Sequence, residues 1–81
     1  MVFFALNRCG YESFSKLNIW DFPLWVVDGV LSAEELTALR MQGMDVSGFN
    51  YALELDDIAG IQDALETIRE HHPAQTVWVS N

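Results

Sequence analysis

The hydrophobic pattern is dominated by two short, nearly continuous apolar runs at residues 24–27 and 76–79. Such a run is typical of a strand covered on both faces, as in a parallel sheet flanked by helices. Pro23 stands before the first run, where a missing N–H is tolerated, and Asp28-Gly29 favours a turn after it. We therefore expect both runs to form central strands, with residues 24–27 in the middle of the sheet.

Two segments, 33–42 and 57–72, have the periodicity and the end signals of helices. Ser32 and Glu35 have the spacing of a capping box, and Gly43 can end the first helix in a left-handed conformation. One face of the second helix carries apolar residues at three- and four-residue steps. These are Ile58, Ile61, Leu65 and Ile68.

The remaining segments predict further strands. Residues 46–51 begin a stretch with alternating apolar positions, which indicates one buried and one wetter face and a place near an edge. In the N-terminal region we expect a strand at 2–6, a turn at 7–10 and a short helical or irregular piece near 11–16. This N-terminal strand is expected to lie antiparallel at an edge.

The order of elements defines the predicted fold class. We expect one domain, 1–81, with residues 1–22 as an N-terminal extension or edge strand and 23–81 as a βαβαβ core. Helical crossovers between strands imply a small, mainly parallel α/β sheet of three to four strands with two helices. A ferredoxin-like α+β sheet is the alternative. The alternation resembles half of a doubly wound nucleotide-binding or receiver-type domain in pattern, without the motifs of either family, and a fold alone assigns no function.

Composition favours a contact with another protein. The chain is 51% hydrophobic and 12% aromatic, whereas a domain of this size hides only about 60% of its extended-chain surface. We therefore expect some apolar surface, including a Trp or Phe, to remain exposed. The simplest partner to cover it is a second copy of the chain, which gives a homodimer. The N-terminal aromatic residues are the predicted interface: Phe3, Phe4, Tyr11, Phe14, Trp20 and Phe22.

The charge balance narrows the classes of partner. A net charge of −8 argues against direct binding to nucleic acid or to anionic membrane surfaces, and it favours solubility or a basic partner. Acidic clusters on one surface could instead imitate a nucleic-acid backbone and inhibit a DNA- or RNA-binding complex. Cys9 is the only cysteine, so no disulfide forms within the chain. No apolar run reaches the length of a membrane span, and we expect a cytoplasmic location.

Candidate chemistry is sparse. In a parallel sheet, Asp28, Asp56 and Asp57 would gather beyond the carboxyl ends of the strands, where ligands and Mg²⁺ bind. A phosphate loop and a second acid two residues after Asp28 are both missing, so an enzyme that uses Asp28 is one hypothesis among three. His71 and His72 point about 100° apart on a helix and do not converge on one ion. We predict no catalytic residues, no metal site and no cofactor, and a non-enzymatic interaction domain is the leading hypothesis.

Overall fold

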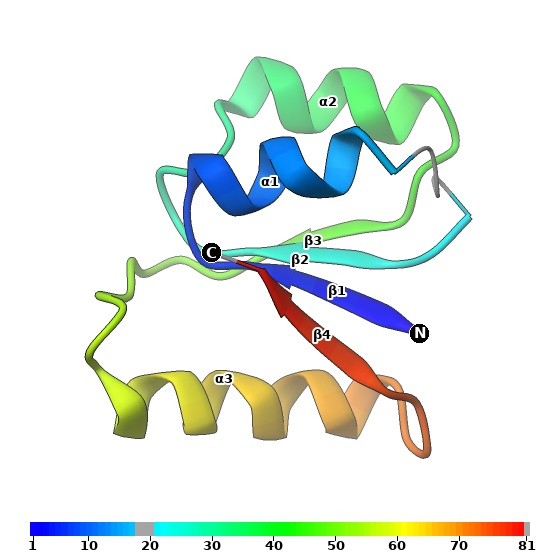
Figure 1. The fold of residues 1–81 in the computed structure, drawn as a ribbon. Coiled ribbons are helices and arrows are strands. Elements are labelled where there is room, and N and C mark those ends of the chain that lie inside the picture. The colour runs from blue at the N-terminus through cyan, green and yellow to red at the C-terminus, as the bar shows by residue number, and fades with distance from the viewer. Residues whose placement is uncertain (18–20, 81) are drawn as a thin grey trace.

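The chain forms a three-layer α/β/α arrangement around one parallel sheet (Figure 1). The computed structural model describes residues 1–17 and 21–80. In these residues four strands pair in the order β3-β2-β1-β4, and helices α1 and α2 lie on one face of the sheet while α3 lies on the other. The elements are β1 (Val2–Ala5), α1 (Arg8–Ser15), β2 (Leu24–Val26), α2 (Ala33–Met41), β3 (Val46–Gly48), α3 (Ile58–His71) and β4 (Val77–Ser80).

The predicted α/β class is confirmed, because every strand pair of the sheet is parallel. The strand order is that of the first four strands of a doubly wound sheet. Parallel pairing also rules out the ferredoxin-like alternative, whose sheet is antiparallel. Among the residues described, no helix combines the length and the apolar character needed to cross a lipid bilayer.

Local signals position the helices as the sequence predicts. The Ser32 hydroxyl accepts from the Glu35 N–H at 3.1 Å, and the Glu35 carboxylate accepts from the Ser32 N–H at 3.0 Å, so the capping box is complete. Gly43 follows α2 with φ of +88°, the left-handed conformation that terminates helices. The Asp57 carboxylate accepts from the Gly60 N–H at 3.0 Å and starts α3.

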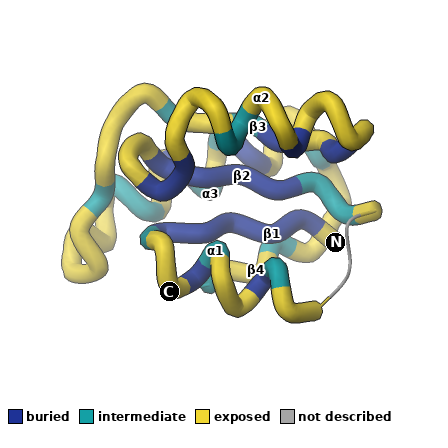
Figure 2. The backbone as a smooth tube through the Cα atoms, turned by 90° about the horizontal axis from the view of Figure 1, so that it is seen from above, coloured by how far each residue is buried: buried dark blue, intermediate teal, exposed yellow. Residues whose placement is uncertain are grey.

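The core lies along β1 and β2, which are buried throughout (Figure 2). Alternate side chains of β1 point to opposite faces. Phe3 meets Phe14 of α1 with ring centroids 5.0 Å apart, whereas Phe4 meets Phe49 on the α3 face at 5.7 Å. The prediction that residues 24–27 are shielded on both faces is confirmed.

Three features differ from expectation. The N-terminal strand is central and parallel, between β2 and β4, because all four of its residues are apolar and both of its faces are covered. Residues 76–79 do not form a doubly covered central strand, since β4 pairs only with β1, at an edge of the sheet. The expected turn at 7–10 is instead the start of α1, because the Asn7 side chain accepts from the Gly10 N–H at 2.8 Å. The predicted edge position of β3 is confirmed.

Candidate functional site

The carboxyl ends of β1 and β4 mark the topological switch point, because α1 follows β1 on one face of the sheet, whereas α3, which follows β3, lies on the other face. Ligands of doubly wound sheets bind in this position. Here the Ser80 hydroxyl donates to the Gly10 carbonyl at 3.1 Å, and the Asn7 side chain caps the same helix. These polar groups therefore hold α1 against β1 and β4 and are already engaged within the fold.

The three aspartates that the sequence predicts as a ligand site are exposed, and each lies next to the end of a strand or the start of a helix. Asp28 follows β2, and its backbone N–H donates to the Tyr51 carbonyl at 2.9 Å. Asp57 caps α3, and Asp56 precedes it in the same turn. Within residues 1–17 and 21–80, no group of three or more His, Cys, Asp or Glu side chains has an arrangement that could hold a metal ion.

Arg8 and Glu35 form an ion pair that joins α1 to α2. An Arg8 guanidinium nitrogen lies 2.7 Å and 2.9 Å from the two carboxylate oxygens of Glu35, and it also donates to the Val30 carbonyl at 3.3 Å. The pKa of the Glu35 carboxyl is lowered, mainly by the hydrogen bond from the Ser32 backbone N–H and next by the hydrogen bond from the Arg8 guanidinium. Glu35 in turn raises the pKa of Arg8. This constellation stabilises the packing of two helices on one face.

Both histidines at the end of α3 contact Trp25. Its ring lies 5.3 Å from the His71 ring and 6.1 Å from the His72 ring, centroid to centroid. Trp25 is buried, and within the described residues its indole N–H has no hydrogen-bond partner. The two histidines thus pack against an aromatic core residue on the α3 face instead of presenting their ring nitrogens to a common ion.

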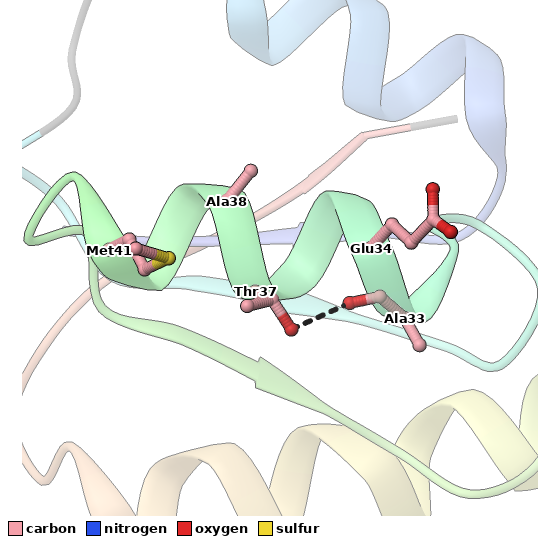
Figure 3. Close-up of a pocket in the computed structure, with 5 residues that line it drawn as sticks. All are labelled: Ala33, Glu34, Thr37, Ala38 and Met41. Carbon is pink, nitrogen blue, oxygen red and sulfur yellow. Dashed lines mark hydrogen bonds between the residues drawn. The ribbon is translucent and has the colours of Figure 1, made fainter.

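A shallow hollow of about 400 Å³ lies along the outer side of α2 (Figure 3). Met41, which is 83% exposed, closes one end, and the Thr37 hydroxyl donates back to the Ala33 carbonyl at 2.9 Å. All the lining residues come from this single helix: Ala33, Glu34, Thr37, Ala38 and Met41. The hollow has no opposing wall and no convergent polar groups, so it lacks the features of a ligand pocket.

Acidic residues are divided between the two faces of the sheet. Glu34 and Glu35 lie on α2, whereas Asp63, Glu66 and Glu70 lie on α3, across the sheet (Figure 1). A mimic of a nucleic-acid backbone needs its carboxylates along one surface, and these two groups do not share one.

The predicted aromatic interface is largely internal. Phe3, Phe4 and Phe14 are core residues, and Tyr11 and Phe22 are partly buried against the core. Trp20 lies outside the described residues. Among the described residues, Trp78 on β4 has an exposed indole, at 55%, and its neighbour Val79 is 39% exposed.

The side chains of β4 project to both faces of the sheet. Trp78 lies on the α1 face, where its ring centroid is 6.3 Å from that of Phe3. Val79 is in register with Phe4 and therefore projects to the α3 face. The sequence does contain a sign of this edge position. Thr76 and Ser80 project to the same face of the strand as Trp78 and make that face more polar than a face enclosed in the core.

Comparison with known proteins matches this chain to no family model, to no curated protein and to no solved structure.

Proposed function

We propose that this chain is a protein-interaction domain that self-associates through the outer side of β4. The observation that carries the proposal is the exposed Trp78 on an edge strand. Indole rings are enriched at protein contacts because they combine a large apolar area with a polar N–H. An interaction role needs no assembled catalytic set.

The exposed part of Trp78 is large enough to contribute measurably. A tryptophan side chain carries about 150–250 Å², so 55% exposure leaves roughly 100 Å² in contact with water. At about 25 cal/mol per Å², covering this area contributes roughly 2–3 kcal/mol for each copy. Val79 adds apolar area on the opposite face of the same strand.

Charge also favours this side of the molecule for contact between copies. The chain carries twelve Asp and Glu and only four Lys and Arg, so two copies repel each other over most of their surface. Residues 73–81, which contain β4, include no charged side chain. Association through β4 therefore brings together a segment of each copy that carries no charged side chain.

Sedimentation velocity over a concentration series tests the proposal. We expect the wild-type chain to shift from monomer to dimer as its concentration rises to the high micromolar range, and Trp78→Ser to remain a monomer. Met41→Ser is the matched control, because it removes an even more exposed apolar side chain from a different surface. A wild-type chain that stays monomeric, or a Trp78→Ser variant that dimerises like wild type, would overturn the proposal.

A further inference from the structure

The two edges of the sheet differ in whether their outward backbone groups are occupied. In β3, the Asp45 carbonyl and the Phe49 N–H bond to β2, so the groups of Val46 and Gly48 face away from the sheet. The outward Val46 carbonyl accepts from the Arg40 guanidinium at 3.0 Å and 3.2 Å. An α2 side chain therefore occupies one of the outward backbone groups of this edge.

At the opposite edge, which β4 forms, the outward backbone groups have no such contact with a side chain of the described residues. The Thr76 and Ser80 carbonyls accept from β1, so the N–H and C=O groups of Val77 and Val79 face outward. In the part of the chain that the structure describes, no side chain donates to or accepts from these outward groups. Natural proteins usually blunt an edge strand with a charge, a proline or a bulge, and β4 contains neither a charged residue nor a proline.

We propose that β4 pairs antiparallel with β4 of a second copy of this chain, joining the two sheets into one continuous sheet. This inference rests on the self-association proposed above and specifies its geometry. When a two-fold axis at the edge of the sheet relates two copies, their β4 strands lie antiparallel to each other. The outward backbone groups of one copy then bond to the same groups of the other copy. Pairing also supplies a partner for each outward backbone group, which burial would otherwise leave unsatisfied.

The outward groups define one preferred register. Antiparallel strands bond through residue pairs that exchange both N–H···O=C bonds. If Val77 of each copy is opposite Val79 of the other, all outward groups of both residues are used. Within the described strand Val77–Ser80, any shift of register leaves some of them without a partner in the other β4. This arrangement puts the two-fold axis at Trp78.

The same register brings the two indoles together. Residues at the axis form a non-hydrogen-bonded pair, with Cα atoms about 4.5 Å apart and side chains on the same face. Both copies of Trp78 then lie side by side on the α1 face, where each is now exposed. Val77 and Val79 form the matching apolar contact on the α3 face. A second copy is the occupant because its identical strand supplies both contacts, and residues 73–81 set no like charges against each other.

Disulfide trapping tests the register. The exposed Cys9 is first replaced by Ser, so that only introduced thiols react. In a glutathione redox buffer, cysteines placed at Val77 and Val79 keep the indole of Trp78, and their expected Cα separation of about 5.5 Å across the contact suits a disulfide. A mixture of Val77→Cys and Val79→Cys should cross-link to each other at least about tenfold more than Val77→Cys alone, since Val77 lies opposite Val79. Equal cross-linking of these samples, or none in any, would overturn the register.

Proline provides the second test, because it removes one N–H without adding a charge. The Val79 N–H faces outward, so Val79→Pro leaves the ladder with β1 intact, as prolines at sheet edges do. We expect the dimer dissociation constant to rise about tenfold or more while the thermal unfolding of the monomer stays close to wild type. Dimerisation that depends on Trp78 but ignores Val79→Pro, without cross-links between positions 77 and 79, would overturn strand pairing and leave the proposed function standing. A monomeric wild-type chain would overturn both the self-association and the strand pairing. If Val79→Pro fails to fold, the cross-linking result alone decides whether the strands pair.

Discussion

The guanidinium group of Arg40 donates two hydrogen bonds to the carbonyl oxygen of Val46, from Nε at 3.2 Å and from Nη2 at 3.0 Å. This contact joins α2 to the outward side of β3 and occupies one carbonyl of that edge. In the described residues no side chain bonds the outward groups of β4, so we expect strand addition to take place at the β4 edge and to end once two copies have paired. An assembly open at both edges could instead extend into a filament.

Replacing Arg40 should remove this limit on growth. Arg40→Met keeps a long unbranched stem but loses both hydrogen bonds, so we expect a loss of about 1–2 kcal/mol in unfolding free energy. With both edges open, we also expect assemblies larger than the dimer, measured by multi-angle light scattering. Combining Arg40→Met with Val79→Pro closes the β4 edge again and should limit association to pairs. An Arg40→Met variant that has the wild-type mass at every concentration would contradict this role.

The contact between Arg8 and Glu35 predicts an acid-dependent loss of stability. The pKa of Glu35 is lowered in the folded chain, so the folded state favours the ionised carboxyl more than the unfolded state does. The stabilisation is therefore fully present above the unfolded pKa of about 4.3 and is lost as the pH falls through the lower folded value. Glu35→Gln should unfold more readily than wild type at pH 7, with the difference shrinking by pH 3 in urea titrations.

Glu34→Gln is the control for this experiment, because it removes the same charge from the neighbouring residue without touching the pair with Arg8. It should keep the acid-dependent loss that Glu35→Gln removes. If both variants had the same pH profile, the effect would come from overall charge.

Trp25 combines a well-packed ring with an unsatisfied donor. It contacts Phe49 at 5.3 Å and His71 at 5.3 Å between ring centroids, while its buried N–H has no partner among the described residues. Trp25→Phe removes that donor and keeps most of the apolar volume, so the expected loss of unfolding free energy is less than about 1.5 kcal/mol. Trp25→Ala opens a cavity and should lose about 3–5 kcal/mol. Equal losses in chemical denaturation would show that the N–H is satisfied in solution.

The parts of the fold that sequence predicts well are those with local causes. Ser32 and Glu35 are three residues apart, so their capping box is visible in the sequence itself. Residues 24–27 are apolar without interruption and are buried, as that pattern indicates. The parallel class follows from the alternation of strands and helices.

The position of the proposed contact surface could not be predicted in the same way. Residues 24–27 and 76–79 have the same character, yet one strand is central and the other is at an edge. The difference depends on β1, which pairs with both and takes the central place expected for β4. Exposure of Trp78 follows from this long-range pairing, and so do the enclosed positions of Phe3 and Phe4.

The turn before β4 contains the one non-glycine residue of the described chain with a positive φ, Ala74 at +65°. A left-handed alanine is strained by about 1–2 kcal/mol, and glycine relieves that strain at a smaller cost in unfolded-state entropy. We therefore expect Ala74→Gly to raise the unfolding free energy by about 0.5–1 kcal/mol. Ala59→Gly, in the first turn of α3, is the control and should lower it. A loss of stability in Ala74→Gly would indicate that this turn is not strained in solution.

Salt should strengthen self-association. Two copies of net charge −8 repel each other, and no charged side chain in residues 73–81 offers an ion pair in return. Raising the ionic strength from about 0.1 M to about 1 M shortens the screening length from roughly 10 Å to roughly 3 Å, which removes repulsion and leaves the apolar contact in place. Sedimentation equilibrium in sodium chloride should give a Kd that falls as salt rises. An Asp63→Asn, Glu66→Gln variant, which removes two carboxylates from α3, should bind more tightly at low salt and respond less to added salt. A Kd that rises with salt would mean that ion pairs hold the contact, as expected for an acidic surface that recognises a basic partner, and would contradict pairing through β4.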